Sequence, residues 1–229
     1  MKPLRILLAG AALVLACDAT AADAKLENQK QKASYGVGMN VGKSFKSDLI
    51  DLDLEAFMTG FKDGLAGKES AVSAQDMEKT MAELRADVTK RTDERMTTNK
   101  KAGEEFLAKN KTAKDVKTLE SGVQYLVEKE GTGPMPKATD TVKVHYRGTL
   151  IDGTEFDSSI KRNEPAVFPV NGVIRGWTEA LQKMKVGSKW KVFIPSDLAY
   201  GDQGQAPVIP PASVLIFDIE LLGIEKEQG

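Results

Sequence analysis

The sequence predicts an α+β protein in which a helical N-terminal half continues through one long helix into a C-terminal antiparallel sheet wrapped on a short helix. Three observations carry this prediction. Residues 25–67 place apolar side chains at helical spacing, residues 73–110 contain no proline, and the pattern after residue 119 changes to strand-like alternation. Helices followed by strands along the chain are typical of the α+β class.

The first residues predict a secretory signal. Lys2 and Arg5 precede an apolar run over residues 6–16, and small residues follow up to Ala21. We therefore expect residues 1–21 to be a signal peptide that is cleaved after Ala21 or nearby. The apolar run is shorter than the roughly 18 residues that would span a bilayer, so the mature protein is expected to have no transmembrane span.

Cys17 leaves an alternative open. It is the only cysteine and follows Leu-Val-Leu-Ala, so lipid modification at Cys17 would make the chain a lipoprotein. Leu15 is bulky where a small residue is usual, and cleavage after Ala21 is therefore the favoured interpretation. The mature chain would then contain no cysteine and would depend on packing rather than on disulfides. We expect a periplasmic protein, with outer-membrane or surface association left open.

Composition argues against several classes of function. The net charge of the chain is −1, which gives no long-range attraction to nucleic acid or to anionic lipid. His145 is the single histidine, and it alternates with apolar residues on the polar face of a predicted strand, where we expect an ordinary surface residue. A zinc site or a Ser-His-Asp triad has little to be built from, and we expect no metal and no cofactor.

Residues 22–72 are predicted to form a helical dimerisation domain. Apolar side chains at spacings of three and four run through residues 54–65, and a second helix is expected over residues 28–49. Two short helices bury little, so the stripe that includes Phe57, Met58 and Phe61 would stay exposed in a monomer. We therefore expect a second copy of the chain to cover it, which makes the protein a homodimer.

Residues 73–118 are predicted to form a long connecting helix. A Ser-x-x-Asp pattern at Ser73 resembles a capping box, and a proline-free run of about 37 residues would extend about 55 Å. Its first half carries an apolar stripe and should pack, whereas residues 89–109 are polar on all sides. We interpret residues 89–109 as a semi-rigid arm in solvent, with partial fraying or disorder near Thr97 and Gly103 as the alternative.

Residues 119–229 form the third predicted region. Strand-like segments are separated by turns rich in Gly, Pro and Asp, and only the segment GWTEALQKMKVG has helical spacing. In that segment Trp177, Leu181 and Met184 fall on one side. This pattern predicts an antiparallel sheet packed on one short helix.

Four motifs occur together in this region. In chain order they read VHYRGTLIDGTEFDSS, VIRGWTEALQKMKVGSK, IPSDLAYGDQG and VIPPASVLIFDIELL. In order and spacing they resemble the FKBP-type peptidyl-prolyl cis-trans isomerases over about residues 119–225, which implies an FKBP-like half-barrel. The helical N-terminal half resembles the homodimeric macrophage infectivity potentiator branch of that family, in architecture and loose composition.

The resemblance implies a proline-binding pocket with Trp177 as its floor. The implied catalytic residues are Asp157, Tyr200, Tyr146, Phe217 and Trp177. The implied substrate-binding residues are Phe156, Arg162, Val173, Ile174, Gln205, Val208 and Ile209.

Within this pocket the resemblance sets polar groups at the rim. Asp157 and Tyr200 would lie there, and the backbone N–H of Ile174 would donate to the substrate carbonyl. For Asp157 two roles stay open: orienting Tyr146 or Arg162, or facing the carbonyl directly.

Three positions depart from the family pattern. Ala166 replaces a usual aromatic residue, Gln205 a common histidine and Val208 a common isoleucine. These changes bear on affinity and sequence preference more than on activity.

The implied activity is isomerisation of Xaa-Pro peptide bonds during the folding of exported proteins, without a covalent intermediate or cofactor. The expected partners are proline-containing unfolded or partly folded polypeptides, and macrolides are expected inhibitors. The alternative is a periplasmic holdase that binds unfolded chains with weak or no isomerase activity, since methionine-rich surfaces adapt to varied partners. A surface adhesin or virulence factor is a third hypothesis, for which the sequence offers no test beyond the location signal.

Overall fold

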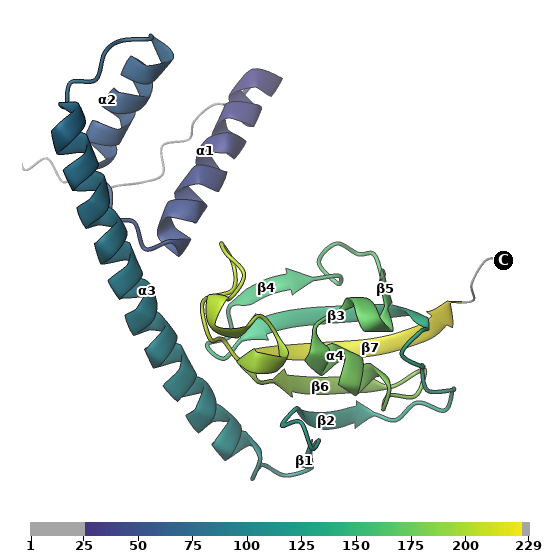
Figure 1. Cartoon of the computed structure of the whole chain (residues 1–229). Coiled ribbons are helices and arrows are strands. Elements are labelled where there is room, and N and C mark those ends of the chain that lie inside the picture. The colour runs from purple at the N-terminus through teal and green to yellow at the C-terminus, as the bar shows by residue number, and fades with distance from the viewer. Residues whose placement is uncertain (1–25, 226–229) are drawn as a thin grey trace, which may run out of the picture. The chain divides into compact units, whose positions relative to one another are not determined.

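The structure is a computed structural model that describes residues 26–225 (Figure 1). The predicted signal peptide, with Cys17 and Ala21, lies outside the described residues. The chain divides into two compact units between Met39 and Asn40. Among residues 26–225, no helix is both long enough and apolar enough to cross a membrane.

Three helices precede the sheet. They are α1 (Gln29–Ser47), α2 (Leu54–Leu65) and α3 (Ala74–Asn110). Asp53 caps α2 by accepting a hydrogen bond from the backbone N–H of Ala56. The predicted cap of the long helix is confirmed, because the Ser73 hydroxyl accepts from the N–H of Asp76 at 3.1 Å and α3 runs for 37 residues.

The apolar side chains of α1 and α2 are not buried within the single chain. Neither helix contains a buried residue, and the exposed fraction is 54% for Phe61 and 75% for Leu65. Phe57 forms ring contacts with Phe45 and Phe61, with centroids 5.5 and 6.4 Å apart. These rings form a small aromatic cluster whose outer side remains in contact with solvent.

The predicted antiparallel sheet is confirmed. Its strands are β1 (Val116–Thr118), β2 (Gln124–Lys129), β3 (Thr141–Leu150), β4 (Glu155–Ser158), β5 (Ala166–Pro169), β6 (Lys189–Ile194) and β7 (Leu215–Glu225). The strand order is β1-β2-β6-β7-β3-β4, and β5 pairs with β3 beside β4. All pairings are antiparallel, and the longest joins β3 to β7.

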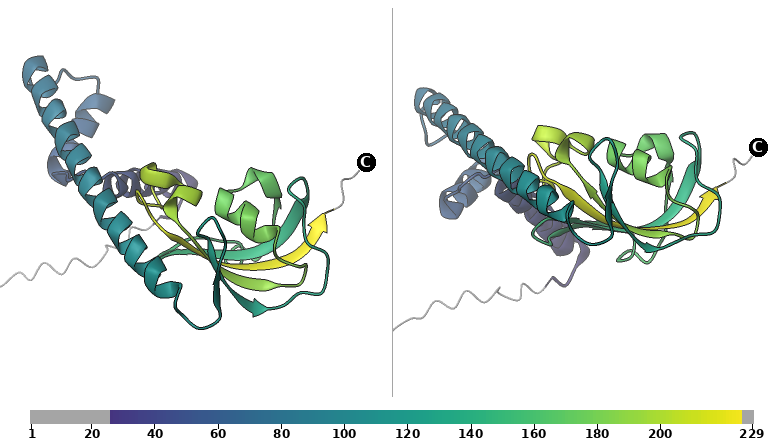
Figure 2. Two further views of the ribbon diagram at one scale, coloured as in Figure 1. Left: turned by 60° about the horizontal axis from the view of Figure 1, so that its bottom comes forward. Right: turned by 90° about the horizontal axis from the view of Figure 1, so that it is seen from below.

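The helix α4 (Arg175–Leu181) packs on one face of this sheet, as the edge-on views show (Figure 2). The predicted apolar side of this segment is confirmed, since Trp177, Leu181 and Met184 are all buried. The helix itself is shorter than its apolar pattern and ends before Met184. The core lies between α4 and the inward side chains of β3, β6 and β7.

Strand β3 shows the expected alternation. Val142, Val144 and Tyr146 are buried, and the residues between them face the other side of the sheet. His145 belongs to this polar face as predicted, but it is half-buried and its Nδ1 lies 3.1 Å from the Ser159 hydroxyl.

The predicted solvent-exposed arm needs a correction at its C-terminal end. Gly103 is buried, and the ring of Phe106 lies 5.9 Å from that of Phe193 on β6. The helix also continues without a break to Asn110, so the structure shows no fraying at Thr97 or Gly103. Because Gly103 has no side chain, α3 can approach Val214 closely at this point. The polar character of residues 89–109 did not reveal this contact.

Candidate active site

A pocket with a volume of about 820 Å³ opens above the start of α4. Its walls come from β3, β4, β5, β7, the segment before α4, and the loop that follows the short 3-10 helix η3 (Gly201–Gln203). The lining residues are Tyr146, Phe156, Asp157, Phe168, Gly172, Val173, Ile174, Trp177, Ala199, Tyr200, Gln205, Ala206, Pro207, Val208, Ile209 and Phe217.

Trp177 is surrounded by aromatic rings that stand edge-on to its indole. The centroids of Tyr146, Phe168 and Phe217 lie 5.3, 5.9 and 5.1 Å from that of Trp177, with interplanar angles of 87°, 90° and 83°. Such perpendicular contacts are a preferred arrangement of aromatic pairs. Only 3% of Trp177 is exposed, yet it lines the pocket, so the indole forms a floor between three upright rings.

Gly176 explains how the indole reaches this place. A Cβ atom at residue 176 would lie 2.4 Å from Cγ2 of Ile194 on β6. Only glycine therefore lets the first turn of α4 press against the sheet, and the next residue then enters the core below the pocket.

Asp157 forms one side of the pocket mouth and is held by two neighbours. Its Oδ2 accepts a hydrogen bond from the Tyr146 hydroxyl, and its Oδ1 accepts from Arg162 and from the backbone N–H of Ser158. Arg162 also donates to the Tyr146 hydroxyl at 3.0 Å. The three side chains form a closed network that fixes the tyrosine ring against the indole.

This network alters the acidity of its members. Partial burial acts to raise the pKa of Asp157, but hydrogen bonds from Tyr146 and Arg162 outweigh it and hold the pKa below its ordinary value. Burial, followed by the hydrogen bond to Asp157, raises the pKa of the Tyr146 hydroxyl. Asp157 is therefore a carboxylate and Tyr146 a neutral phenol at neutral pH.

Two hydrogen-bond donors at the pocket remain free among the described residues. The Tyr200 hydroxyl makes no hydrogen bond to another described residue, and burial followed by the charge of Asp157 raises its pKa. The backbone N–H of Ile174 is likewise unpaired among residues 26–225, whereas its carbonyl accepts from Trp177 and Thr178. Both groups line the pocket and are able to donate to a bound carbonyl.

The structure brings the sequence-predicted residues together with one exception. Eleven of the twelve line the pocket, and Arg162 instead reaches the rim through Asp157 and Tyr146. Their roles in catalysis remain predictions.

Sequence reasoning missed several lining residues, above all Phe168. Alternation within Ala166–Pro169 could have indicated it, because residues 166 and 168 share one face of β5. Phe168 supplies a ring against the indole two residues beyond Ala166, the position where the family's usual aromatic is missing.

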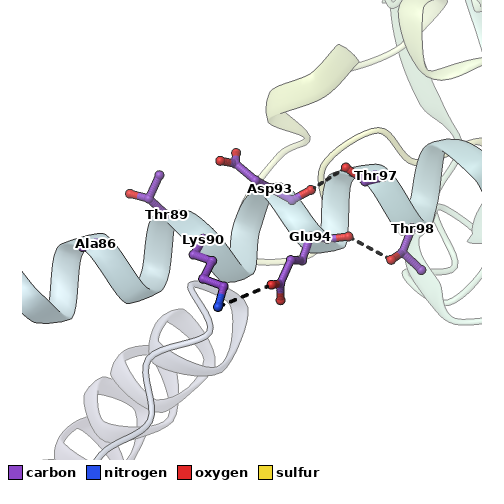
Figure 3. Close-up of a pocket in the computed structure, with 7 residues that line it drawn as sticks. All are labelled: Ala86, Thr89, Lys90, Asp93, Glu94, Thr97 and Thr98. Carbon is purple, nitrogen blue, oxygen red and sulfur yellow. Dashed lines mark hydrogen bonds and ion pairs between the residues drawn. The ribbon is translucent and has the colours of Figure 1, made fainter.

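A second hollow, of about 770 Å³, lies along α3. All of its lining residues belong to this one helix, and their polar groups pair along the helix itself, as between Lys90 and Glu94 at 3.9 Å (Figure 3). A surface walled by a single helix does not enclose a ligand. Within the described part of the chain, no group of three or more His, Cys, Asp or Glu side chains is placed to hold a metal ion.

Comparisons with known protein families match most of the chain. Residues 133–222 match a model described as FKBP-type peptidyl-prolyl cis-trans isomerase, and residues 30–127 match one described as the domain amino-terminal to it.

Individual relatives match nearly the full length. The chain is 47% identical over 219 residues to FKBP-type peptidyl-prolyl cis-trans isomerase FkpA of Aeromonas hydrophila, covering 91% of this chain and 81% of that protein. It is 41% identical to the outer membrane protein MIP of Legionella longbeachae, covering 99% and 98%. The crystal structure of FkpA from Escherichia coli matches with a TM-score of 0.65 and 40% identity, covering 87% of this chain and 98% of that one.

Proposed function

The chain belongs to the FKBP-type peptidyl-prolyl cis-trans isomerases, and on this premise we propose that the pocket above Trp177 binds the proline ring of a polypeptide and lowers the barrier to rotation about the preceding peptide bond. The enzyme is a peptidyl-prolyl isomerase, and the holdase hypothesis with weak or no isomerase activity is not favoured.

The chemistry requires no nucleophile. A peptide bond resists rotation by about 18–20 kcal/mol because the amide is stabilised by resonance, while the cis and trans forms of Xaa-Pro are nearly balanced in energy. At the twisted midpoint the resonance is lost and the amide becomes less dipolar. Transfer into an apolar site therefore costs less free energy for the twisted amide than for the planar one. The site binds the transition state in preference to the ground state.

The observation that carries this proposal is the ring arrangement around Trp177. Three aromatic rings stand perpendicular to the indole and leave an apolar space above it, bounded by Ile209 and Val173. A pyrrolidine ring laid flat on the indole would be shielded from water on its sides. The amide that precedes it would then lie near the rim.

The rim supplies donors for the substrate carbonyl. The unpaired Tyr200 hydroxyl and the Ile174 N–H are proposed to hold it while the amide turns. Both carboxylate oxygens of Asp157 are already engaged, which supports a positioning role toward Tyr146 and Arg162 over direct contact with the carbonyl.

An isomerisation assay on a short Xaa-Pro peptide, with and without a macrolide inhibitor, tests the proposal. Tyr200→Phe and Asp157→Ala should each reduce kcat/KM by about 5- to 30-fold, the equivalent of one charge-assisted or substrate-bound hydrogen bond. Tyr125→Phe is the matched control, because Tyr125 stacks on Trp190 outside the pocket at 4.3 Å and should leave the rate unchanged. Equal rates for all three variants would overturn the proposed site.

The enzyme is further proposed to be a homodimer joined through its N-terminal helices. Support comes from the match to the family's amino-terminal domain and from the apolar side chains that α1 and α2 leave exposed, including Leu54, Phe61 and Leu65. Solvent-exposed apolar stripes of this kind mark interaction surfaces.

We also propose that the protein is exported and acts on proline-containing, partly folded chains outside the cytoplasm. The signal-like N-terminus supports this, and one relative is named an outer membrane protein. Detection of the mature N-terminus at residue 22 in a periplasmic extract would test both export and the cleavage site. A lipidated N-terminus at Cys17 would instead support membrane attachment.

A further inference from the structure

The last third of α3 carries a face that packs on the C-terminal domain. Its buried and half-buried residues recur at spacings of three and four, and they are Asn99, Ala102, Gly103, Phe106, Leu107 and Asn110. Residues between them, such as Thr98 and Glu104, are exposed. This is the pattern of a helix with one partnered face.

The final turn of this helix is bonded to the sheet. Gln124 on β2, 4% exposed, donates from Nε2 to the carbonyl of Leu107 at 2.9 Å and accepts at Oε1 from Asn110 at 2.8 Å. The carbonyl of Leu107 also accepts from the backbone N–H of Lys111 at 2.9 Å, so Gln124 adds a bond from the sheet to a carbonyl that the helix end already uses. The end of α3 is therefore part of the domain that carries the pocket.

The same face also contacts the loop that forms one pocket wall. We call residues 205–214 the pocket loop. Its first half lines the pocket and is closed by two hydrogen bonds of 2.8 Å between the backbones of Gln205 and Ile209. Its second half runs beside α3 in the views of Figure 1 and Figure 2.

Two contacts join that second half to α3. The Nδ2 atom of Asn99 donates to the carbonyl of Pro211 at 2.8 Å, in a partly buried position. One turn further along, Gly103 lies so close to Val214 that an added Cβ would be 2.7 Å from its Cγ2 atom. Prolines 210 and 211 have no N–H to donate, so their carbonyls are the backbone groups that can pair. Within the loop Ser213 donates to Pro210, Ala212 donates to Gly201 ahead of the loop, and the bond from Asn99 to Pro211 is the one that comes from α3.

We propose that Asn99 is a positioning residue for substrate binding, which acts by holding the pocket loop so that Val208 and Ile209 stay against the pocket. The inference rests on the proposed pocket above Trp177. It assigns to the connecting helix a part in the catalytic domain, beyond joining that domain to the N-terminal helices.

The kinetic signature follows from what the pocket loop supplies. On this proposal the side chains of Val208 and Ile209 close the pocket from one side and contact the substrate in the planar and in the twisted form, whereas the aromatic floor and the rim donors lie on other elements. Loosening the pocket loop removes uniform binding, so KM should rise while kcat is little changed.

Steady-state isomerisation kinetics on the full chain test this. Asn99→Asp keeps the shape of the side chain but turns a carboxylate oxygen toward the carbonyl of Pro211, and it should raise KM by about 2- to 10-fold with kcat within twofold. Gly103→Ala, which forces Val214 to move, should act in the same direction. Thr98→Ala is the matched control, because its exposed hydroxyl bonds only to the carbonyl of Glu94 in the same helix at 2.8 Å (Figure 3).

Amide hydrogen exchange supplies a second readout that a general loss of stability would not imitate. In Asn99→Asp the N–H groups of Gln205 and Ile209 should exchange faster, while those of the β3–β7 ladder keep their wild-type rates. Unchanged KM and unchanged exchange in both α3 variants would overturn the positioning role. If Tyr200→Phe also left activity intact, the pocket assignment itself would be at fault, which separates the two failures.

Discussion

The two tryptophans of the chain allow a paired test of the pocket floor. Trp177 and Trp190 are buried to almost the same degree, with 3% and 4% exposed, and the Nε1 of each has no partner among the described residues. Only Trp177 lines the pocket, whereas Trp190 stacks on Tyr125 with an interplanar angle of 8°. Trp177→Phe and Trp190→Phe therefore share a structural cost and differ in their effect on the pocket.

The structural cost can be worked out first. Complete removal of a buried tryptophan side chain costs about 3–5 kcal/mol, and phenylalanine retains most of its volume, so each variant should lose on the order of 1–2 kcal/mol of unfolding free energy. The three edge-on ring pairs of Trp177, at about 0.5–1.5 kcal/mol each, would be weakened rather than removed. Urea titration should find both variants folded and similarly destabilised.

Only Trp177→Phe should lower the catalytic efficiency. A narrower floor loses about 1–2 kcal/mol of contact with the proline ring, so kcat/KM for an Xaa-Pro peptide should drop about 5- to 30-fold in Trp177→Phe. In Trp190→Phe it should stay within about twofold of wild type. If the two variants isomerise the peptide equally well, the indole of Trp177 is not the floor and the reasoning fails.

Four further outcomes are expected. Because the pKa of Asp157 is lowered and that of Tyr200 raised, kcat/KM should be constant between about pH 5 and 9; a bell-shaped profile would contradict this. The stabilisation from Asp157 is complete above its unfolded pKa and is lost as the pH falls through the lower folded pKa, so in acid titrations Asp157→Asn should lack that loss. Phe61→Glu should convert a dimer into a monomer by light scattering, and a monomeric wild type would refute the proposed interface. Gly176→Ala should lower the unfolding free energy by about 1–3 kcal/mol through the clash with Ile194, and wild-type stability in denaturant would show that α4 is free to shift.

Local patterns predicted much of the fold. The cap at Ser73, the alternation along β3 and the apolar side that contains Trp177 and Leu181 all depend on neighbours in sequence, and the structure reproduces them. The candidate site residues came from four motifs that resemble those of one family. Eleven of these twelve residues line one pocket, because the family's fold brings the four segments together there.

What the sequence did not reveal depends on contacts between distant segments. Phe168 becomes a pocket wall only because β5 pairs with β3 in a register that turns its ring toward the indole. The docking of α3 includes a bond from the side chain of Gln124 to the backbone carbonyl of Leu107 and a close approach at Gly103, and neither a polar side chain nor a glycine carries an apolar signal. Side chains that bond across the fold look like ordinary surface residues in a linear pattern.

Strand β7 has a consequence for how the enzyme itself reaches its native state. It is the last of the described strands in chain order, yet it lies between β6 and β3 and carries Phe217 to the pocket above Trp177. During synthesis the edges of β6 and β3 that face β7 stay unpaired until residues 215–225 have been made. Pairing between strands that are distant in sequence is slow and leaves strand edges unpaired. This isomerase is therefore itself prone to aggregate until residues 215–225 have paired with β6 and β3.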